Sequence, residues 1–150
     1  EEIIQTLKIR KGKEAREIIP IRVLEIGEVN AAYEWVSNTI KKTQTKDFTS
    51  QESDIEKLQK LIDSGTIQAN QRPAWENIGL AFGAIIENEM DGMTWVSVID
   101  GQKEYPALQF EDLLIEPSNL VWGKIKAKTP CNLKAEYEQI REEVENIINK

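Results

Sequence analysis

The spacing of the apolar residues changes near residue 93, and this change limits the folds that the chain can form. Before that point apolar residues recur three and four positions apart, which places them on one face of a helix. In residues 94–99 the β-branched and aromatic residues are dense, as is typical of a strand. Helical spacing returns after Asn132. Helices on both sides of one run of strands indicate the α+β class.

The first expected helix covers about residues 21–42. Its inward residues are spaced 3, 4, 3 and 4 positions apart: Ile26, Val29, Tyr33, Val36 and Ile40. Pro20 is expected at the first position of this helix, where its missing N–H costs little. Residues 1–19 show no spacing that assigns them to a helix or a strand.

Three further helices have recognisable ends. Thr49 and Glu52 form a capping signal ahead of the second helix, and Gly65 supplies the left-handed residue that commonly closes a helix. Pro73 opens the third helix, in which Gly79 and Gly83 are expected to let another element approach closely. Asn132 is expected to cap the last helix, whose inward residues are Leu133, Tyr137, Ile140, Val144 and Ile147.

Two turn signals divide the strand region. Asp100-Gly101 is typical of a hairpin, and Glu111-Asp112 precedes a short third strand. Pro117 then starts either a short helix or an extended connection. We therefore expect one domain over 1–150, with about four helices packed around a small antiparallel three-stranded meander. The three expected strands cover residues 94–99, 105–110 and 113–116.

The net charge of −7 is concentrated in one stretch of the chain. Residues 73–123 contain nine acidic side chains and one basic side chain, Lys103, a local net charge of −8. Such a field repels phosphate backbones and anionic lipids and attracts basic proteins. We expect no nucleic-acid binding. The favoured function is a non-catalytic protein-interaction domain that turns this acidic face toward a basic protein partner through Glu87, Glu89 and Asp91. The alternative is that these acids only solvate one side of the domain.

The sequence lacks the residues of the common catalytic and metal-binding sets. It has no histidine and one cysteine, Cys131. These two counts exclude Ser-His-Asp and Cys-His catalysis, histidine-ligated metals and an internal disulfide. Cys131 is expected to be a small, inert residue. No glycine-rich phosphate-binding motif is present. We expect no catalytic residue, no cofactor and no metal ion, and we favour a protein that is not an enzyme.

Carboxylates near the expected strand ends support an alternative function, a carboxylate-based enzyme or small-ligand binder with a site beside the sheet. Two acids act as general acid and base where a cleft separates their pKa values. The candidates are Asp100, Glu104, Glu111, Asp112 and Glu116.

Residues 87–92 resemble the first half of an EF-hand loop. The twelfth position of such a loop requires a bidentate Glu, but Val98 stands there. We therefore expect a solvated helix end at residues 87–92.

Two of the four tryptophans are candidate interface residues. Trp75 and Trp95 fall on expected core faces, whereas Trp35 lies off the inward face of its helix and Trp122 follows Pro117. Exposed tryptophans often anchor interfaces, which makes Trp35 and Trp122 the candidates. The alternative for both is partial burial at the edge of the domain.

A series of short motifs follows in order from Asp54 onward. It comprises Leu58-Gln59, Ser64-Gly65, Trp75, Ile78-Gly79, Gly83, Met93-Thr94-Trp95, Gly101, Pro106-Ala107-Leu108, Leu114, Pro117 and Leu120-Val121. This series resembles a bacterial family catalogued as domain of unknown function 3806. The resemblance implies a family-like α+β core at 51–150, an N-terminal helical extension at 1–50 and a bacterial source. Because the activity of the family is not established, it implies no catalytic residue.

One position departs from the family pattern. Members tend to carry a Lys-Arg pair shortly after the last hydrophobic pair, and here Gly123-Lys124 stands there. Lys124 is thus the residue that would retain a role of that basic pair, and we count it among the candidate interface residues.

The sequence also bears on location. The longest run without a charged residue, residues 77–86, has ten residues, whereas a membrane span needs about twenty. We expect a cytoplasmic protein. Because the sequence begins with Glu1 and not with Met, a signal peptide removed earlier is the alternative.

Overall fold

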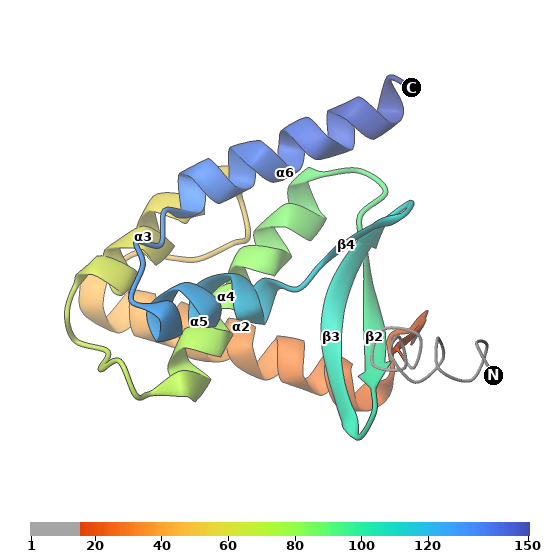
Figure 1. The fold of residues 1–150 in the computed structure, drawn as a ribbon. Coiled ribbons are helices and arrows are strands. Elements are labelled where there is room, and N and C mark those ends of the chain that lie inside the picture. The colour runs from red at the N-terminus through yellow and green to blue at the C-terminus, as the bar shows by residue number, and fades with distance from the viewer. Residues whose placement is uncertain (1–15) are drawn as a thin grey trace.

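The structure, a computed structural model, describes residues 16–150 as a four-stranded antiparallel sheet beside a group of helices (Figure 1). The strands lie in the sheet in their sequence order, β1-β2-β3-β4. Their bounds are Arg16–Pro20 for β1, Thr94–Asp100 for β2, Lys103–Phe110 for β3 and Leu113–Ile115 for β4. The helices are α2 (Val23–Gln44), α3 (Ile55–Asp63), α4 (Arg72–Glu89), α5 (Pro117–Ala127) and α6 (Leu133–Ile148), with a 3-10 turn at Glu52–Asp54.

The α+β class is confirmed, but the expected numbers of helices and strands are wrong. Residues 16–150 contain five helices because Pro117 starts the helix α5 and not an extended connection. They contain four strands because β1, within the unassigned N-terminal residues, pairs with β2 from Arg16 opposite Asp100 to Pro20 opposite Val96. That pairing joins residues about half the chain apart, so no local spacing could indicate it.

The start of the first helix is also corrected. Pro20 ends β1, and α2 begins at Val23. The N–H of Arg22, the residue before the helix, donates to Ser97 Oγ on β2 at 2.9 Å, which fixes α2 against the sheet. This attachment sets which face of α2 turns inward. Ile26, expected to be buried, is 42% exposed, and Glu25 is fully buried in its place.

The expected capping pair of the second helix is replaced by Asp54. Its carboxylate Oδ2 accepts the N–H groups of Thr49 at 2.8 Å and Gln51 at 3.0 Å, and its Oδ1 lies 2.7 Å from Lys57 Nζ. A buried carboxylate with three donors organises the turn more strongly than the exposed Glu52 can. Gly65, with φ +78, follows α3 as expected.

The close approach expected at the two glycines of α4 is confirmed. A Cβ on Gly79 would collide with the carbonyl oxygen of Pro117 and lie 2.8 Å from Ser118 Cα. A Cβ on Gly83 would lie 2.8 Å from Pro117 Cγ and 2.9 Å from the ring of Trp95. The start of α5 therefore rests directly on the backbone of α4.

The main core lies between the helices and one face of the sheet. It includes Val36 of α2, Phe82 of α4, Leu108 of β3 and Tyr137 of α6. The expected inward face of α6 is buried, apart from Ile147, which is half-buried, and Asn132 Oδ1 accepts the N–H of Ala135 at 3.1 Å. The division into an extension, 1–50, and a core, 51–150, stays a prediction, and residues 1–15 of that extension lie outside the described residues.

Candidate functional site

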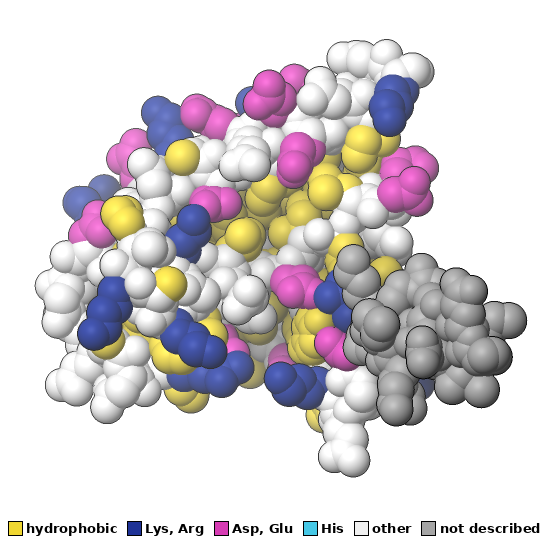
Figure 2. Space-filling model, in the orientation of Figure 1, with side chains coloured by type: hydrophobic (Ala, Val, Ile, Leu, Met, Phe, Trp, Pro, Cys, Tyr) yellow, Lys and Arg dark blue, Asp and Glu magenta, His cyan; other side chains and the backbone are white. Residues whose placement is uncertain are grey.

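A groove of about 730 Å³ runs between β4, α5 and α6. Its floor is apolar and includes Leu113, Ile115, Leu120 and Ile140. Figure 2 shows apolar side chains gathered in the hollow between α6 and the segment formed by β4 and α5. On the α5 wall, Gly123 and Ala127 are small and leave the groove wide.

Charged side chains line the rim of the groove. Lys124 of α5 and Glu136 of α6 form an ion pair across it at 3.5 Å, and Arg16 and Glu116 form another at 3.5 Å. Glu143 also lines the groove, and it has no ion pair within residues 16–150. The rim therefore carries three acids and two bases, which leaves it acidic.

Glu116 has a second partner, the phenol of Tyr105. The hydroxyl of Tyr105 donates to Glu116 Oε2 at 2.8 Å. Burial, together with the negative charge of Glu116, raises the pKa of Tyr105 to about 12. The phenol therefore keeps its proton and holds Glu116 in place at the start of α5.

One wall of the groove is β4, the last strand of the sheet that the structure describes. Within the described strands β4 pairs only with β3, from Phe110 opposite Leu113 to Leu108 opposite Ile115. The four consecutive residues 113–116 all line the groove, so the groove follows this edge. In an antiparallel pair the residues alternate between facing the neighbouring strand and facing away. Counting from the two-residue turn, the N–H and C=O of Leu114 face away from β3.

The acidic residues selected from the sequence lie near the end of α4. Glu87, Glu89 and Asp91 are all exposed, and α4 ends at Glu89, so residues 87–92 form a helix end as expected. Glu89 Oε2 accepts the N–H of Glu52 at 2.7 Å and so also holds a loop. A Cβ on Gly92 would lie 2.9 Å from the ring of Phe110, so this turn packs on the end of β3.

The turn between β3 and β4 extends the acidic surface. Glu111 and Asp112 form this turn and are exposed. Acidic side chains therefore continue from the end of α4 to the beginning of the groove.

The five strand-end carboxylates have different neighbours. Glu104 lies 3.5 Å from Arg22, and Glu116 binds Tyr105 and Arg16. Asp100 stands opposite Arg16 and Lys103 in the strand register. The structure thus spreads these carboxylates over several places and puts Glu116 alone of the five on the groove.

A different group of glutamates, which the sequence analysis missed, comes together from α2, α4 and β3. Glu25 is fully buried; its Oε1 accepts the hydroxyl of Ser97 at 2.6 Å, and its Oε2 has no hydrogen-bond partner among residues 16–150. The interaction with the neighbouring Glu25 is the main cause that raises the pKa of Glu104. Burial, followed by the charges of Glu25, Glu76 and Glu104, raises the pKa of Glu28. One sequence signal could have indicated that Glu25 is buried: its spacing to Ala32 and Val36 places all three on one face of the helix.

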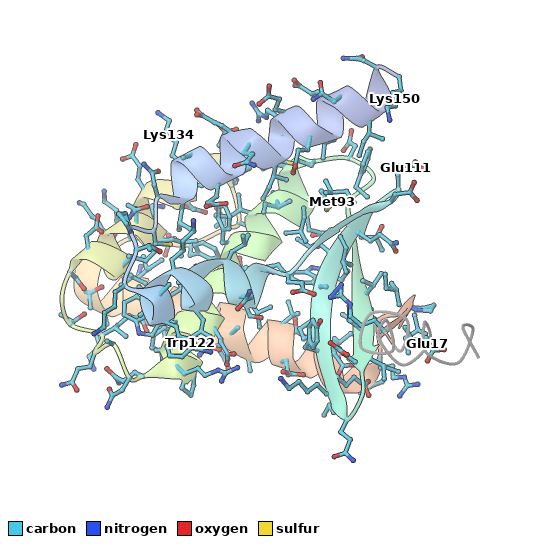
Figure 3. All side chains as sticks on the ribbon, viewed as in Figure 1. Glu17, Met93, Glu111, Trp122, Lys134 and Lys150 are labelled. Carbon is cyan, nitrogen blue, oxygen red and sulfur yellow. The ribbon has the colours of Figure 1, made fainter. Side chains whose placement is uncertain are left out.

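The two candidate tryptophans are half-buried at the edge of the core. Trp35 lines a cavity of about 290 Å³ with residues of the start of α4. The guanidinium of Arg72 lies 5.4 Å from the centre of the Trp122 ring, a cation–π contact within the chain (Figure 3 labels Trp122). Their role in an interface stays a prediction.

Cys131 is buried, with a free thiol. Burial, with a smaller effect of Glu136, raises the pKa of Cys131 to about 11, so the thiol stays protonated and weakly reactive. Within residues 16–150 no three His, Cys, Asp or Glu side chains are placed to hold a metal ion. None of the helices in that range has the length and apolarity that crossing a membrane requires.

The comparisons with known proteins agree with this architecture. A crystal structure of a protein from Bacteroides thetaiotaomicron VPI-5482, at 1.50 Å resolution, is similar with a TM-score of 0.82 and 41% sequence identity. The match covers 85% of this chain and 48% of that one, so this chain spans about half the length of the solved relative. No curated protein matches the chain. Residues 54–137, more than half of the chain, match the family described as Domain of unknown function (DUF3806), and the chain belongs to this family.

Proposed function

We propose that the chain is a protein-binding domain whose groove between β4, α5 and α6 takes an extended, basic segment of a partner protein. The observation that carries this proposal is the coincidence of an apolar groove with a strand edge that is unpaired within residues 16–150. Residues 113–115 form the strand edge, and residues 113–116 line the groove. An extended peptide that adds to a sheet edge gains main-chain hydrogen bonds from the edge and specificity from the pockets beside it.

The backbone supplies the first part of the binding energy. The outward N–H and C=O of Leu114 can each bond to the partner, and an edge left free in this way is a template for another strand. Each such hydrogen bond contributes about 0.5–1.5 kcal/mol net. β4 has three residues, so these bonds set the register of the partner and leave most of the affinity to side chains.

The apolar floor supplies the second part. Alternate side chains of an extended partner point the same way, toward Leu120 and Ile140 on the two helices. The absence of bulk at Gly123 and Ala127 leaves space for them along α5. Burial of apolar area in such a groove contributes about 25 cal/mol per Å².

Charge favours a basic partner. Glu143 on the rim has no ion pair within residues 16–150, and Glu111 and Asp112 follow at the β4 end. A lysine or arginine of the partner would meet these acids. The outer acids Glu87, Glu89 and Asp91 would speed association without touching the bound segment, because exposed charges act mainly on the rate of encounter.

The test is selection of short peptides followed by binding to matched variants. Random peptides of about ten residues are selected against the protein by display, since strand addition needs only a short extended segment. The substitutions Gly123→Leu and Ala127→Trp together fill the groove from α5. Ala135→Trp places the same bulk on an exposed position of α6 outside the groove and serves as control.

We expect the selected peptides to alternate apolar and other residues and to carry lysine or arginine. The filled groove should raise the dissociation constant at least about tenfold, whereas Ala135→Trp should leave it unchanged. Neutralising Glu87, Glu89 and Asp91 should lower the association rate and its salt dependence and leave the dissociation rate unchanged. Peptides that bind the filled groove as tightly as the native one, or no enriched peptide at all, would contradict the proposal.

A further inference from the structure

A second cavity, of about 250 Å³, lies between α2, α4 and β3 and has no lining residue in common with the groove in the described part of the chain. Two glutamates stand on its walls, Glu28 of α2 and Glu76 of α4. Its other walls are largely apolar and include Ala31, Pro73 and Leu80. In the view of Figure 2, acidic and apolar side chains meet in the hollow between β3 and α5.

The charges around this cavity are unbalanced. Four glutamates act on one another there: Glu25, Glu28, Glu76 and Glu104. Two arginines oppose them: Arg22 lies 3.5 Å from Glu104 and Arg72 lies 3.0 Å from Glu76, with side chains 55% and 59% exposed. Within residues 16–150, Glu25 and Glu28 form no ion pair. The surroundings of the cavity therefore carry more negative than positive charge.

Glu25, the buried glutamate of this group, has one carboxylate oxygen that the described residues leave without a hydrogen-bond donor. Glu25 is fully buried and Ser97 donates a hydrogen bond to its Oε1, while no donor in the described part of the chain reaches its Oε2. A buried carboxylate without a cation is costly, because water no longer solvates it. Glu25 does not line the cavity, so Glu28 and Glu76 are the carboxylates that face it.

The cavity continues toward an aromatic ring. The cavity beside Trp35, of about 290 Å³, shares Pro73 and Asn77 with the glutamate cavity. On α2, Glu28, Ala31 and Trp35 follow at spacings of three and four residues, so they occupy one face of the helix. A ligand seated here would meet carboxylates at one end, apolar walls along its length and an indole at the other end.

We propose that this cavity binds an alkylammonium group, with the ammonium between Glu28 and Glu76 and the alkyl chain along Ala31 and Pro73 toward Trp35. An ammonium carries three N–H donors, which match two carboxylates, and its methylene chain matches the apolar walls. A divalent metal ion needs more oxygen ligands at once than this arrangement supplies in the described residues. The shared chemistry fits both a lysine side chain of another protein and a free aliphatic diamine.

The first experiment uses 1,5-diaminopentane as probe and methyl NMR of Ala31 and Leu80 as readout. We expect saturable shifts of the methyl signals of Ala31 and Leu80. We also expect the probe to quench the part of the tryptophan fluorescence that Trp35→Phe removes. Pentan-1-ol, with the same chain and no charge, should not shift the methyl signals. The double substitution Glu28→Gln and Glu76→Gln should weaken diamine binding at least about tenfold.

The controls separate this site from the groove and from general acidity. Glu56→Gln and Glu138→Gln remove two exposed acids on α3 and α6 and should leave binding unchanged. The filled groove, Gly123→Leu with Ala127→Trp, should also bind the diamine normally. The proposal fails if pentan-1-ol shifts the same signals, if the Glu28 and Glu76 substitutions have no effect, or if no saturable shift occurs.

A second probe distinguishes the source of the ammonium group. Nα-acetyl-lysine methylamide presents a lysine side chain as a protein would. If it binds as tightly as the diamine, the site takes a lysine of another protein; if the diamine binds at least about tenfold more tightly, the site takes a free diamine. Both outcomes support an alkylammonium site. If neither probe binds, the proposal is overturned.

Discussion

At the scale of single residues, Glu25 shows how tertiary contacts override a helical pattern. The spacing of apolar residues in α2 favours Ile26 as the inward residue, yet Glu25 is fully buried and Ile26 is 42% exposed. The cause lies outside the helix, since Ser97 on β2 donates to Glu25 at 2.6 Å and also accepts the N–H of Arg22 at 2.9 Å. Two hydrogen bonds to one serine thus set the rotation of the helix start.

We predict that Glu25→Gln stabilises the protein. The amide oxygen keeps the acceptor for Ser97, and the amide N–H₂ places a donor where Oε2 now has no partner, beside Glu104. A hydrogen bond to a charged group contributes about 1.5–3 kcal/mol, and the free energy of unfolding at neutral pH should rise by about 1–3 kcal/mol. Urea denaturation measures the change. Glu34→Gln, at an exposed position of the same helix, should change it by less than about 0.5 kcal/mol. A loss of stability in Glu25→Gln would show that the negative charge itself is needed.

At the scale of the elements, the contact between α4 and α5 depends on one absent side chain. Gly79 faces the backbone of Pro117 and Ser118, which cannot rotate away as a side chain could. Because α5 carries one wall of the groove, the closeness of this contact also sets the width of the groove.

We predict that Gly79→Ala destabilises the protein by about 1–3 kcal/mol, the usual cost of adding bulk to a packed contact. Its control is Gly27→Ala in α2, where a Cβ meets nothing within 4 Å. That change should raise the free energy of unfolding by about 0.4–1 kcal/mol, because alanine restricts the unfolded chain. Chemical denaturation followed by tryptophan fluorescence compares the two variants. Equal effects in both would mean that α5 can shift freely over α4.

The elements with local signals were predictable from the sequence, and the others were not. Pro73, Gly65 and Asn132 mark helix ends through their own backbone chemistry. Asp100-Gly101 indicates the hairpin between β2 and β3, although Asp100 still pairs with Lys103 and the two turn residues are Gly101 and Gln102. β1 depends on pairing with β2, and the cap of α3 depends on the buried Asp54, which no spacing rule distinguishes from Glu52.

The candidate sites follow the same division. The sequence indicated single residues that line cavities, Trp35 and Lys124. It did not indicate the glutamates that meet near β3, because they come from three elements and their grouping exists only in the folded chain.

At the scale of the whole molecule, folding shifts the pKa values of different carboxyl groups in opposite directions. Burial alone would raise the pKa of Asp54, but its hydrogen bonds from Lys57, Gln51 and Thr49 lower it below 3.8. The stability that Asp54 adds is therefore present above pH 3.8 and is lost as the pH falls through its lower folded-state pKa. Burial, followed by acidic neighbours, raises the pKa of Glu28 above 4.5, and the neighbouring Glu25, followed by burial, raises the pKa of Glu104 above 4.5. Their protonated forms favour the folded state, and that contribution is lost as the pH rises above 4.5.

We therefore predict a stability maximum in mildly acidic solution, with a decline on both sides. Above the maximum, stability declines because Glu28 and Glu104 lose their protons. The net charge of −7 adds repulsion that lowers stability in the same direction. Thermal unfolding between about pH 3 and 8 measures the profile. Glu104→Gln should flatten the neutral side, because the amide cannot ionise, and Asp54→Asn should lower stability mainly on the side above pH 3.8, where the native carboxylate is charged. Glu56→Gln, an exposed substitution on α3, should leave the shape of the curve unchanged. A neutral side that stays equally steep in Glu104→Gln would mean that general repulsion, and not the meeting of Glu25 with Glu104, sets the pH response of the molecule.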